Sequence, residues 1–164
     1  MAYVGRVSLS ATGFYKTPGL AWDRIEGRGR PFFYFAYGAA VTEVAIDTLT
    51  GENRVIRVDI LHDVGTSLNS AIDLGQIEGG YVQGTGWLTT EELWWNDKGI
   101  LKTHAPSTYK IPVCGDRAPD MRINLWTRGE NSEKTIYRSK AVGEPPLMLC
   151  ISALMALSDA VAGA

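Results

Sequence analysis

The sequence predicts an α+β fold in which a largely antiparallel sheet packs with two main helices. Two segments alternate apolar and polar residues with period two around turn residues, which is typical of β-hairpins. Two other segments carry apolar residues at helical spacing. Strands outnumber helices and pair as hairpins, so the pattern favours an α+β architecture. At 164 residues the chain is close to the commonest domain size.

The first hairpin is expected from Tyr34 onward. Apolar side chains alternate over residues 40–46 and again over residues 56–60, and Thr50-Gly51-Glu52-Asn53 supplies the turn. A second hairpin is expected over residues 93–102, around the turn Asn96-Asp97-Lys98-Gly99. Residues 121–125 alternate in the same way, so we expect a further strand there.

Two helices are expected. The first begins at Asn69 or Ser70, which are both good N-caps, and runs to about residue 88. The second starts after Pro145-Pro146, because proline is tolerated in the first turn of a helix. Its apolar residues occur on both sides, so we expect this C-terminal helix to be buried.

Residues 1–33 contain glycine and proline too often for a long element. We expect an irregular N-terminal segment over residues 1–33 that wraps the domain, or lies on a surface absent from this chain. Residues 34–164 are then expected to form a single α+β domain.

Composition excludes several classes of protein. Hydrophobic residues make up 45% and charged residues 21%, which is typical of a folded globular chain. Sixteen basic and 18 acidic residues give a net charge of −2, so we expect no nucleic-acid partner. The longest apolar run, residues 147–157, is shorter than the ~20 residues of a membrane span, so we expect no membrane crossing.

The two cysteines, Cys114 and Cys150, are far apart and form no C-x-x-C motif. This chain alone therefore cannot supply a zinc or iron–sulfur site. The first thirty residues include charged side chains and no uninterrupted apolar core, which argues against a secretory signal. A reducing, cytoplasmic setting is the simplest expectation.

The predicted first helix contains far more glycine than helices favour, at about 1 kcal/mol per glycine relative to alanine. Gln76 and Gln83 are seven residues apart and so share a face, beside Gly75, Gly79 and their glycine neighbours. A glycine-floored notch between two amides suits a planar heteroaromatic ligand. The alternative is close helix packing through Gly75 and Gly79 with both glutamines in solvent, and the residues alone favour this packing.

Gly143-Glu144-Pro145-Pro146 is the second candidate site. Proline disfavours the helical region for Glu144, and the helix that follows presents its positive end nearby. A carboxylate held there is a candidate general base. The alternatives are a helix cap and a solvated glutamate.

Other polar residues are weaker candidates. His62 and His104 have no second ligand at metal spacing, so we expect a core or loop histidine at each position. Glu91-Glu92 beside Trp94-Trp95 suggests carbohydrate chemistry, but adjacent residues of a strand point to opposite faces. A free-standing, aromatic-rich module that binds carbohydrate or a small molecule without catalysis is the rival hypothesis. It would use all five tryptophans: Trp22, Trp87, Trp94, Trp95 and Trp126.

Three motifs together resemble a known family. Gly75-Gln76-Ile77-Glu78-Gly79, Ser107-Thr108-Tyr109-Lys110-Ile111-Pro112 and Lys140-Ala141-Val142-Gly143-Glu144-Pro145-Pro146-Leu147 occur in that order. In order and separation they resemble the C-terminal end of the molybdenum-binding portion of the xanthine dehydrogenase family. Residues 7–15 and 63–69 fit the same family, so the resemblance spans essentially the whole chain.

The resemblance implies a molybdopterin-dependent hydroxylase, an oxidoreductase that acts on an electron-poor carbon of a purine. Glu144 falls on the position of the family's general base. Gln76 falls on the position of the glutamine that hydrogen-bonds the pterin, with Gly75 and Gly79 beside it as cofactor-contacting residues. The resemblance thus replaces the packing alternative for Gln76, whereas the role of Gln83 stays open.

In that family the molybdenum portion is several times longer than this chain. The resemblance therefore implies a C-terminal domain, inactive alone, whose partners are the upstream molybdopterin-binding domains and an iron–sulfur/FAD subunit. The metal's remaining contacts lie upstream, so no metal ligand is expected here. The iron–sulfur clusters and FAD belong to other domains or chains.

Overall fold

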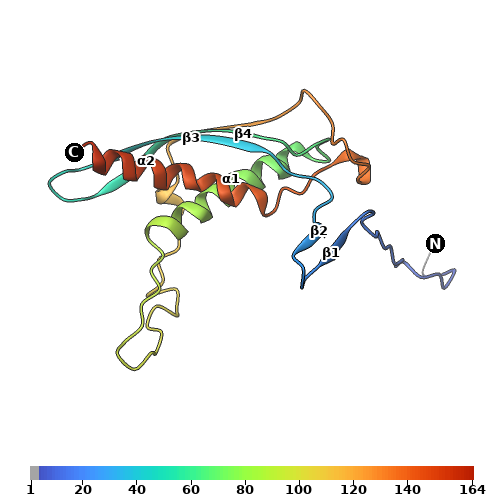
Figure 1. Cartoon of the computed structure of the whole chain (residues 1–164), viewed down its shortest axis with the longest axis horizontal. Helices are drawn as coiled ribbons and strands as arrows, with labels where there is room; N and C mark the ends of the chain where they lie inside the picture. The colour runs from blue at the N-terminus through green and yellow to red at the C-terminus, as the bar shows by residue number, and fades with distance from the viewer. Residues whose placement is uncertain (1–3) are drawn as a thin grey trace. The chain divides into compact units, whose positions relative to one another are not determined.

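The computed structural model describes residues 4–164 (Figure 1), which divide into two compact units between Phe33 and Tyr34. In the first unit, β1 (Ala21–Asp23) and β2 (Arg28–Arg30) form an antiparallel hairpin. Asp23 Oδ1 accepts hydrogen bonds from the amides of Ile25 (2.9 Å) and Glu26 (3.0 Å), which closes the turn. The rest of this unit is irregular, as the frequent glycine and proline residues predict.

The second unit is built on a three-stranded sheet with the order β3-β4-β5. β3 (Gly38–Ile46) and β4 (Asn53–His62) form the predicted hairpin, with a register shift between Glu43 and Val44. β5 (Asp120–Leu125) pairs with β4 in parallel, so the sheet is mixed. A parallel pair needs a long crossover, and here the chain between β4 and β5 includes the first long helix.

Helix α1 (Ser70–Thr89) begins where the sequence predicts. The N-cap is Asn69, whose Oδ1 accepts hydrogen bonds from the amides of Ala71 (3.1 Å) and Ile72 (3.3 Å). The second helical region starts as a 3-10 helix, η3 (Pro145–Cys150), and continues as α2 (Ile151–Ala162). Two short 3-10 helices, η1 (Cys114–Asp116) and η2 (Ile136–Arg138), lie in the connecting segments.

The helices and the sheet enclose one core. Val58 and Ile60 of β4 pack with Ile77 and Tyr81 of α1 and with Ala153 of α2. Hydroxyl groups also join the three elements inside it: Thr42 Oγ1 of β3 is 2.8 Å from Tyr81 Oη and 2.7 Å from Ser152 Oγ. The α+β class predicted from the sequence is therefore confirmed.

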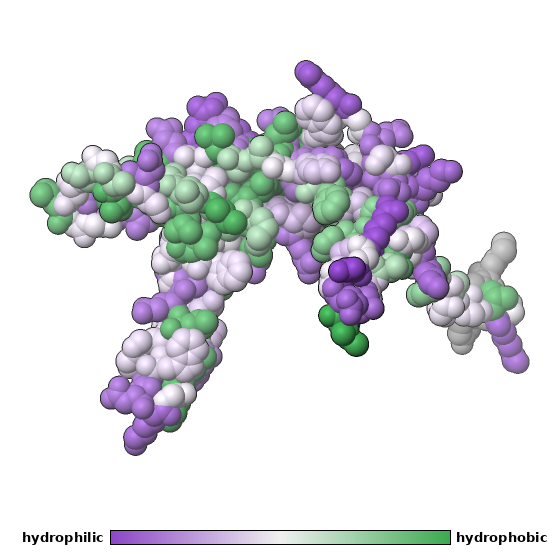
Figure 2. All heavy atoms as spheres, viewed as in Figure 1, coloured by the Kyte–Doolittle hydropathy of each residue, from purple (hydrophilic) through white to green (hydrophobic). Residues whose placement is uncertain are grey.

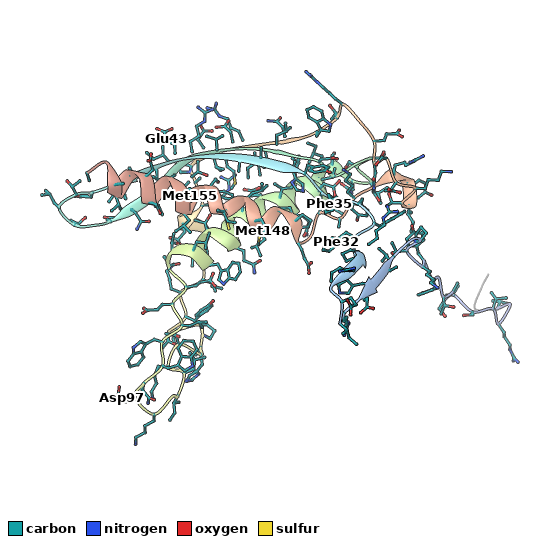
Figure 3. The ribbon with its side chains drawn as sticks, viewed as in Figure 1. Phe32, Phe35, Glu43, Asp97, Met148 and Met155 are labelled. Atoms are coloured by element: carbon teal, nitrogen blue, oxygen red, sulfur yellow. The ribbon has the colours of Figure 1, made fainter. Side chains whose placement is uncertain are left out.

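The expectation of a buried C-terminal helix is wrong. Of the α2 residues only Ala153 is buried, whereas Ile151 and Met155 are 45% and 62% exposed. The helix packs one side against β3, and its other apolar side lies at the surface of this chain. Figure 2 shows apolar side chains over this region, and Figure 3 labels Met155 on α2 and Met148 on the preceding η3.

One helical stretch of the described residues, Pro145–Ala162, passes a length and composition test for a membrane span. It has 18 residues and a mean hydropathy of 1.6, so it is longer than the apolar run visible in the sequence. A single stretch of this kind is weak support for a span, because it also packs against α1 and β3.

The second predicted hairpin exists as a projecting arm, defined here as residues 91–111 (Figure 1). Its turn is closed by hydrogen bonds from Asn96 N to Ile100 O (3.0 Å) and from Lys102 N to Trp94 O (2.8 Å). Pairing is limited to an isolated bridge between Trp95 and Leu101. The arm therefore forms the predicted turn without a regular ladder.

Two glycines let α1 approach η3 closely. A Cβ at Gly84 would collide with Cys150 Sγ and lie 2.9 Å from Leu147 O, and a Cβ at Gly80 would lie 3.2 Å from Pro146 Cβ. Gly75 and Gly79 have no such neighbour within 4 Å. The alternative of close helix packing through Gly75 and Gly79 is therefore wrong, because the adjacent face of α1, which carries Gly80 and Gly84, makes the close contact.

Replacing Gly84 with alanine should destabilise the fold. The added methyl group has no room beside Cys150, so we expect Gly84→Ala to lower the free energy of unfolding by about 1–3 kcal/mol. Gly79→Ala is the matched control, because its methyl group meets open space and alanine favours helix by up to about 1 kcal/mol. Urea denaturation measures both, and equal stabilities of the two variants would contradict this packing.

His62, at the end of β4, is a core histidine, as expected. It is 1% exposed, and neither ring nitrogen has a hydrogen-bond partner among residues 4–164. Burial lowers the pKa of His62, and Lys140 lowers it further while Asp63 opposes the shift. The ring is closely packed, because a Cβ at Gly38 would lie 2.5 Å from His62 Nδ1.

Because the pKa of His62 is lowered, we expect the stability of the folded chain to vary with pH in the mildly acidic range. Below about pH 6.5 the unfolded chain binds a proton at this histidine and the folded chain does not, so stability falls as pH falls. The slope from one group is at most about 1.4 kcal/mol per pH unit. His62→Leu should flatten the dependence of thermal stability on pH between pH 7 and 5, and an unchanged slope in this variant would contradict the role of His62.

Candidate functional site

One side of α1 carries an exposed strip that we call the open face. Its members recur at helical spacing and face away from the core, and none is buried in this chain. They are Ile72, Gly75, Gln76, Gly79, Gln83 and Trp87. The helix presents this face because its opposite side, with Ile77 and Tyr81, is held in the core.

The two glutamines of the open face have free side chains. Neither Gln76 nor Gln83 makes a side-chain hydrogen bond to any residue from 4 to 164. Gly75 and Gly79 leave bare backbone between and beside them, with no other atoms within 4 Å of a Cβ built there. The face therefore offers amide donors and acceptors next to a flat surface.

Glu144 lies just before η3. Its backbone adopts φ −104° and ψ −40°, so the expectation that proline excludes the helical region at this residue is wrong. The 3-10 turn accounts for this, because Leu147 N donates a hydrogen bond to Glu144 O at 3.0 Å. The carboxylate is exposed and does not cap the helix, so the capping alternative is not supported.

The structure brings Gln76 close to the segment that carries Glu144. A Cβ at Gly143 would lie 3.9 Å from Gln76 Oε1. The packing of Gly80 and Gly84 on Pro146 and Cys150 fixes this approach, because it seats α1 directly on η3. Gly75 and Gly79 lie on the same face as Gln76, and Gln83 lies two turns further along it.

The loop before Glu144 is held by an ion pair that sequence reasoning did not identify. Lys140 Nζ lies 2.5 Å from Asp63 Oδ2, and the two side chains are 7% and 17% exposed. Both residues occur in motifs that resemble the xanthine dehydrogenase family, but a pairing between distant segments has no local sequence signal.

The remaining candidates do not form a site. Within residues 4–164, no three His, Cys, Asp or Glu side chains group as metal ligands. Cys114 is exposed and Cys150 is buried, and both are free. The pKa of Tyr109 is raised by a hydrogen bond to Glu91, so this carboxylate has a partner within the base of the arm.

The tryptophans come from different elements of the two units. Trp22 belongs to β1, Trp87 to α1 and Trp126 follows β5, whereas Trp94 and Trp95 lie on the arm. A recess of about 320 Å³ on the arm contains no carboxylate; it is lined by Leu93, Thr103, His104, Ala105, Pro106, Tyr109 and Ile111. These positions give no support to a carbohydrate-binding module.

Comparison with known proteins identifies the family. A family model described as "Molybdopterin cofactor-binding domain" matches residues 1–118. The chain belongs to this molybdopterin cofactor-binding domain family. It is 52% identical over 163 residues to xanthine dehydrogenase/oxidase of Felis catus and 48% identical over 169 residues to xanthine dehydrogenase of Oryza sativa subsp. japonica. Each alignment covers 99% of this chain and 12% of the relative, so the chain spans a small part of those proteins.

Solved structures share the fold. Quinoline 2-oxidoreductase from Pseudomonas putida 86 matches with a TM-score of 0.66 and 32% identity, over 73% of this chain and 15% of that chain. CO dehydrogenase from Oligotropha carboxidovorans matches with a TM-score of 0.70 over 78% of this chain and 16% of that chain, at 24% identity. The second likeness concerns the fold alone.

Proposed function

We propose that this chain is the C-terminal part of the molybdenum-binding portion of a molybdopterin-dependent purine hydroxylase of the xanthine dehydrogenase type. The observation that carries the proposal is the approach of Gln76 to the Gly143-Glu144 segment. It places the free Gln76 amide beside the residue that directly precedes Glu144, whose carboxylate is exposed. The similarity to xanthine dehydrogenases over 99% of the chain supports the purine substrate class.

The residues of the open face fit a pterin cofactor. Gln76 has no protein partner for its amide, and the open space at Gly75 and Gly79 admits a ligand against the helix backbone. These three residues would hold the pterin end of a molybdenum–molybdopterin cofactor. The chain supplies no metal-ligand cluster within residues 4–164, so the other contacts fall to upstream molybdopterin-binding domains.

The isolated chain is therefore expected to be inactive. Electron transfer away from the site requires iron–sulfur clusters and FAD, which another domain or an iron–sulfur/FAD subunit would supply. The free cysteines Cys114 and Cys150 suit a reducing, cytoplasmic location.

Glu144 is the proposed general base. When bound, the cofactor supplies the two-electron oxidation of an electron-poor purine carbon. The Glu144 carboxylate is exposed and not engaged as a cap, so it is free to accept a proton from the attacking oxygen. Gln76 would orient the cofactor through its amide.

Glu144→Gln in the complete enzyme tests the proposal directly. The amide preserves shape and polarity but cannot accept the proton, so kcat should fall by about 10²–10⁴ while molybdenum content stays normal. Steady-state kinetics with xanthine and metal analysis give the two readouts. A variant that turns over at a near-normal rate would remove Glu144 from the mechanism.

Gln76→Ala should instead weaken cofactor retention. Loss of the amide removes a contact to the pterin without touching the base, so molybdenum content or the redox potential of the metal should change. Gln83→Ala is the comparison, with a smaller effect expected because Gln83 lies two turns of α1 beyond Gln76. Normal molybdenum content with normal kinetics in Gln76→Ala would count against the assigned role.

A further inference from the structure

We propose that Asp63 and Lys140 are positioning residues for Glu144, and that their ion pair fixes the loop from which this base projects. The inference rests on the proposed function, because it assigns a role in the reaction of Glu144. Neither residue is proposed to touch substrate or cofactor. Their effect would be transmitted through the three residues that join Lys140 to Glu144.

The ion pair is sheltered and well connected. Lys140 Nζ lies 2.5 Å from Asp63 Oδ2 and 5.1 Å from the centre of the Tyr37 ring. Asp63 Oδ1 accepts a hydrogen bond from Gly65 N at 2.8 Å, and Asp63 N donates to Tyr37 O at 2.8 Å. The carboxylate is thus oriented by its own turn before it binds the lysine. The low exposure of both side chains distinguishes this pair from five others, whose side chains are 38–53% exposed: Arg57–Asp59, Arg57–Asp120, Lys110–Asp116, Arg117–Glu78 and Arg122–Asp120.

Backbone contacts hold the same two segments together. Lys140 N donates to Val64 O (2.8 Å), Thr66 N donates to Arg138 O (3.1 Å), and Gly65 forms a bridge with Ser139. Gly65 has φ +63°, and a Cβ there would collide with Arg138 O. The Lys140 side chain therefore adds to a contact between these two segments that already depends on Gly65.

The chain enters this contact through a strained turn. Tyr137 and Arg138 both have positive φ, at 52° and 59°, a backbone conformation that residues other than glycine keep only where the surroundings impose it. Buried Asn131 imposes it from one side, because its Nδ2 donates to Thr135 Oγ1 (3.2 Å) and to Ser139 O (3.3 Å). Arg138 donates from its guanidinium to Asn131 O at 3.1 Å.

Two of the three residues between Lys140 and Glu144 also have fixed neighbours. Ala141 N donates to Tyr34 Oη at 2.8 Å, and Val142 packs against the core. Gly143 lies beside the exposed Gln76 side chain. Beyond Glu144, Pro145 begins η3. A misplacement of about 1 Å at a catalytic group can lower the rate about 10²-fold, so the precision of this loop bears directly on turnover.

The test is a double-mutant cycle in the complete enzyme. Lys140→Met keeps the length of the side chain and removes its charge, so we expect kcat for xanthine to fall by about 10–100-fold with molybdenum content unchanged and KM altered by less than about 3-fold. In the Glu144→Gln background the same change should lower the residual kcat by less than about 2-fold, because the base it positions is already gone. A role limited to stability would give the same loss in both backgrounds.

Two further variants complete the experiment. Asp63→Asn removes the same ion pair from the other side and should reproduce the pattern, which keeps the test open if Lys140→Met does not fold. Arg122→Met breaks the exposed Arg122–Asp120 pair (2.7 Å) on the sheet and should leave kcat unchanged. Equal losses in the two backgrounds, or a loss of kcat that follows loss of molybdenum, would overturn the positioning role. If Glu144→Gln itself turned over normally, the proposed function would fail instead.

Discussion

The contact of α1 with η3 is the constraint on which the rest of the domain depends. Gly80 and Gly84 remove side chains from the helix surface so that Pro146 and Cys150 can lie against its backbone. This seats the start of the C-terminal helical region on α1, from which α2 continues across β3. The same contact sets how near the Gly143-Glu144 segment comes to Gln76, so core packing and site geometry share one cause.

Features with local signals could be predicted from the sequence. Asn69 caps α1 with its own side chain, and the turn residues after β3 close a hairpin within a few positions. The parallel pairing of β5 and the exposure of α2 have no such signal. The path of the crossover connection decides the direction of β5. The exposure of α2 depends on how much of its surface the rest of this chain covers. Apolar composition indicates that the surface of a helix is unfavourable in water, but it does not indicate which partner element covers that surface.

The candidate site divides in the same way. Gln76 and Glu144 could be chosen from short motifs, with the family resemblance supplying the roles that we propose for them. The different roles of the glycines in α1 could not be predicted, because Gly79 and Gly80 are neighbours in sequence and face different surroundings. The Asp63–Lys140 pair joins the end of β4 to the loop before η3, and only the folded chain shows that these segments touch.

The arm also determines where the domain can tolerate inserted residues. It leaves and rejoins the body near one point, where Thr90 Oγ1 donates to Lys110 O at 2.9 Å and Pro112 packs on Gly86. Because its two ends are joined there, inserting residues at the tip near Asp97 adds only loop-closure entropy, about 0.6 kcal/mol for each doubling of loop length. The arm is thus the part of this domain whose length can diverge while α1, η3 and the residues they carry stay in place.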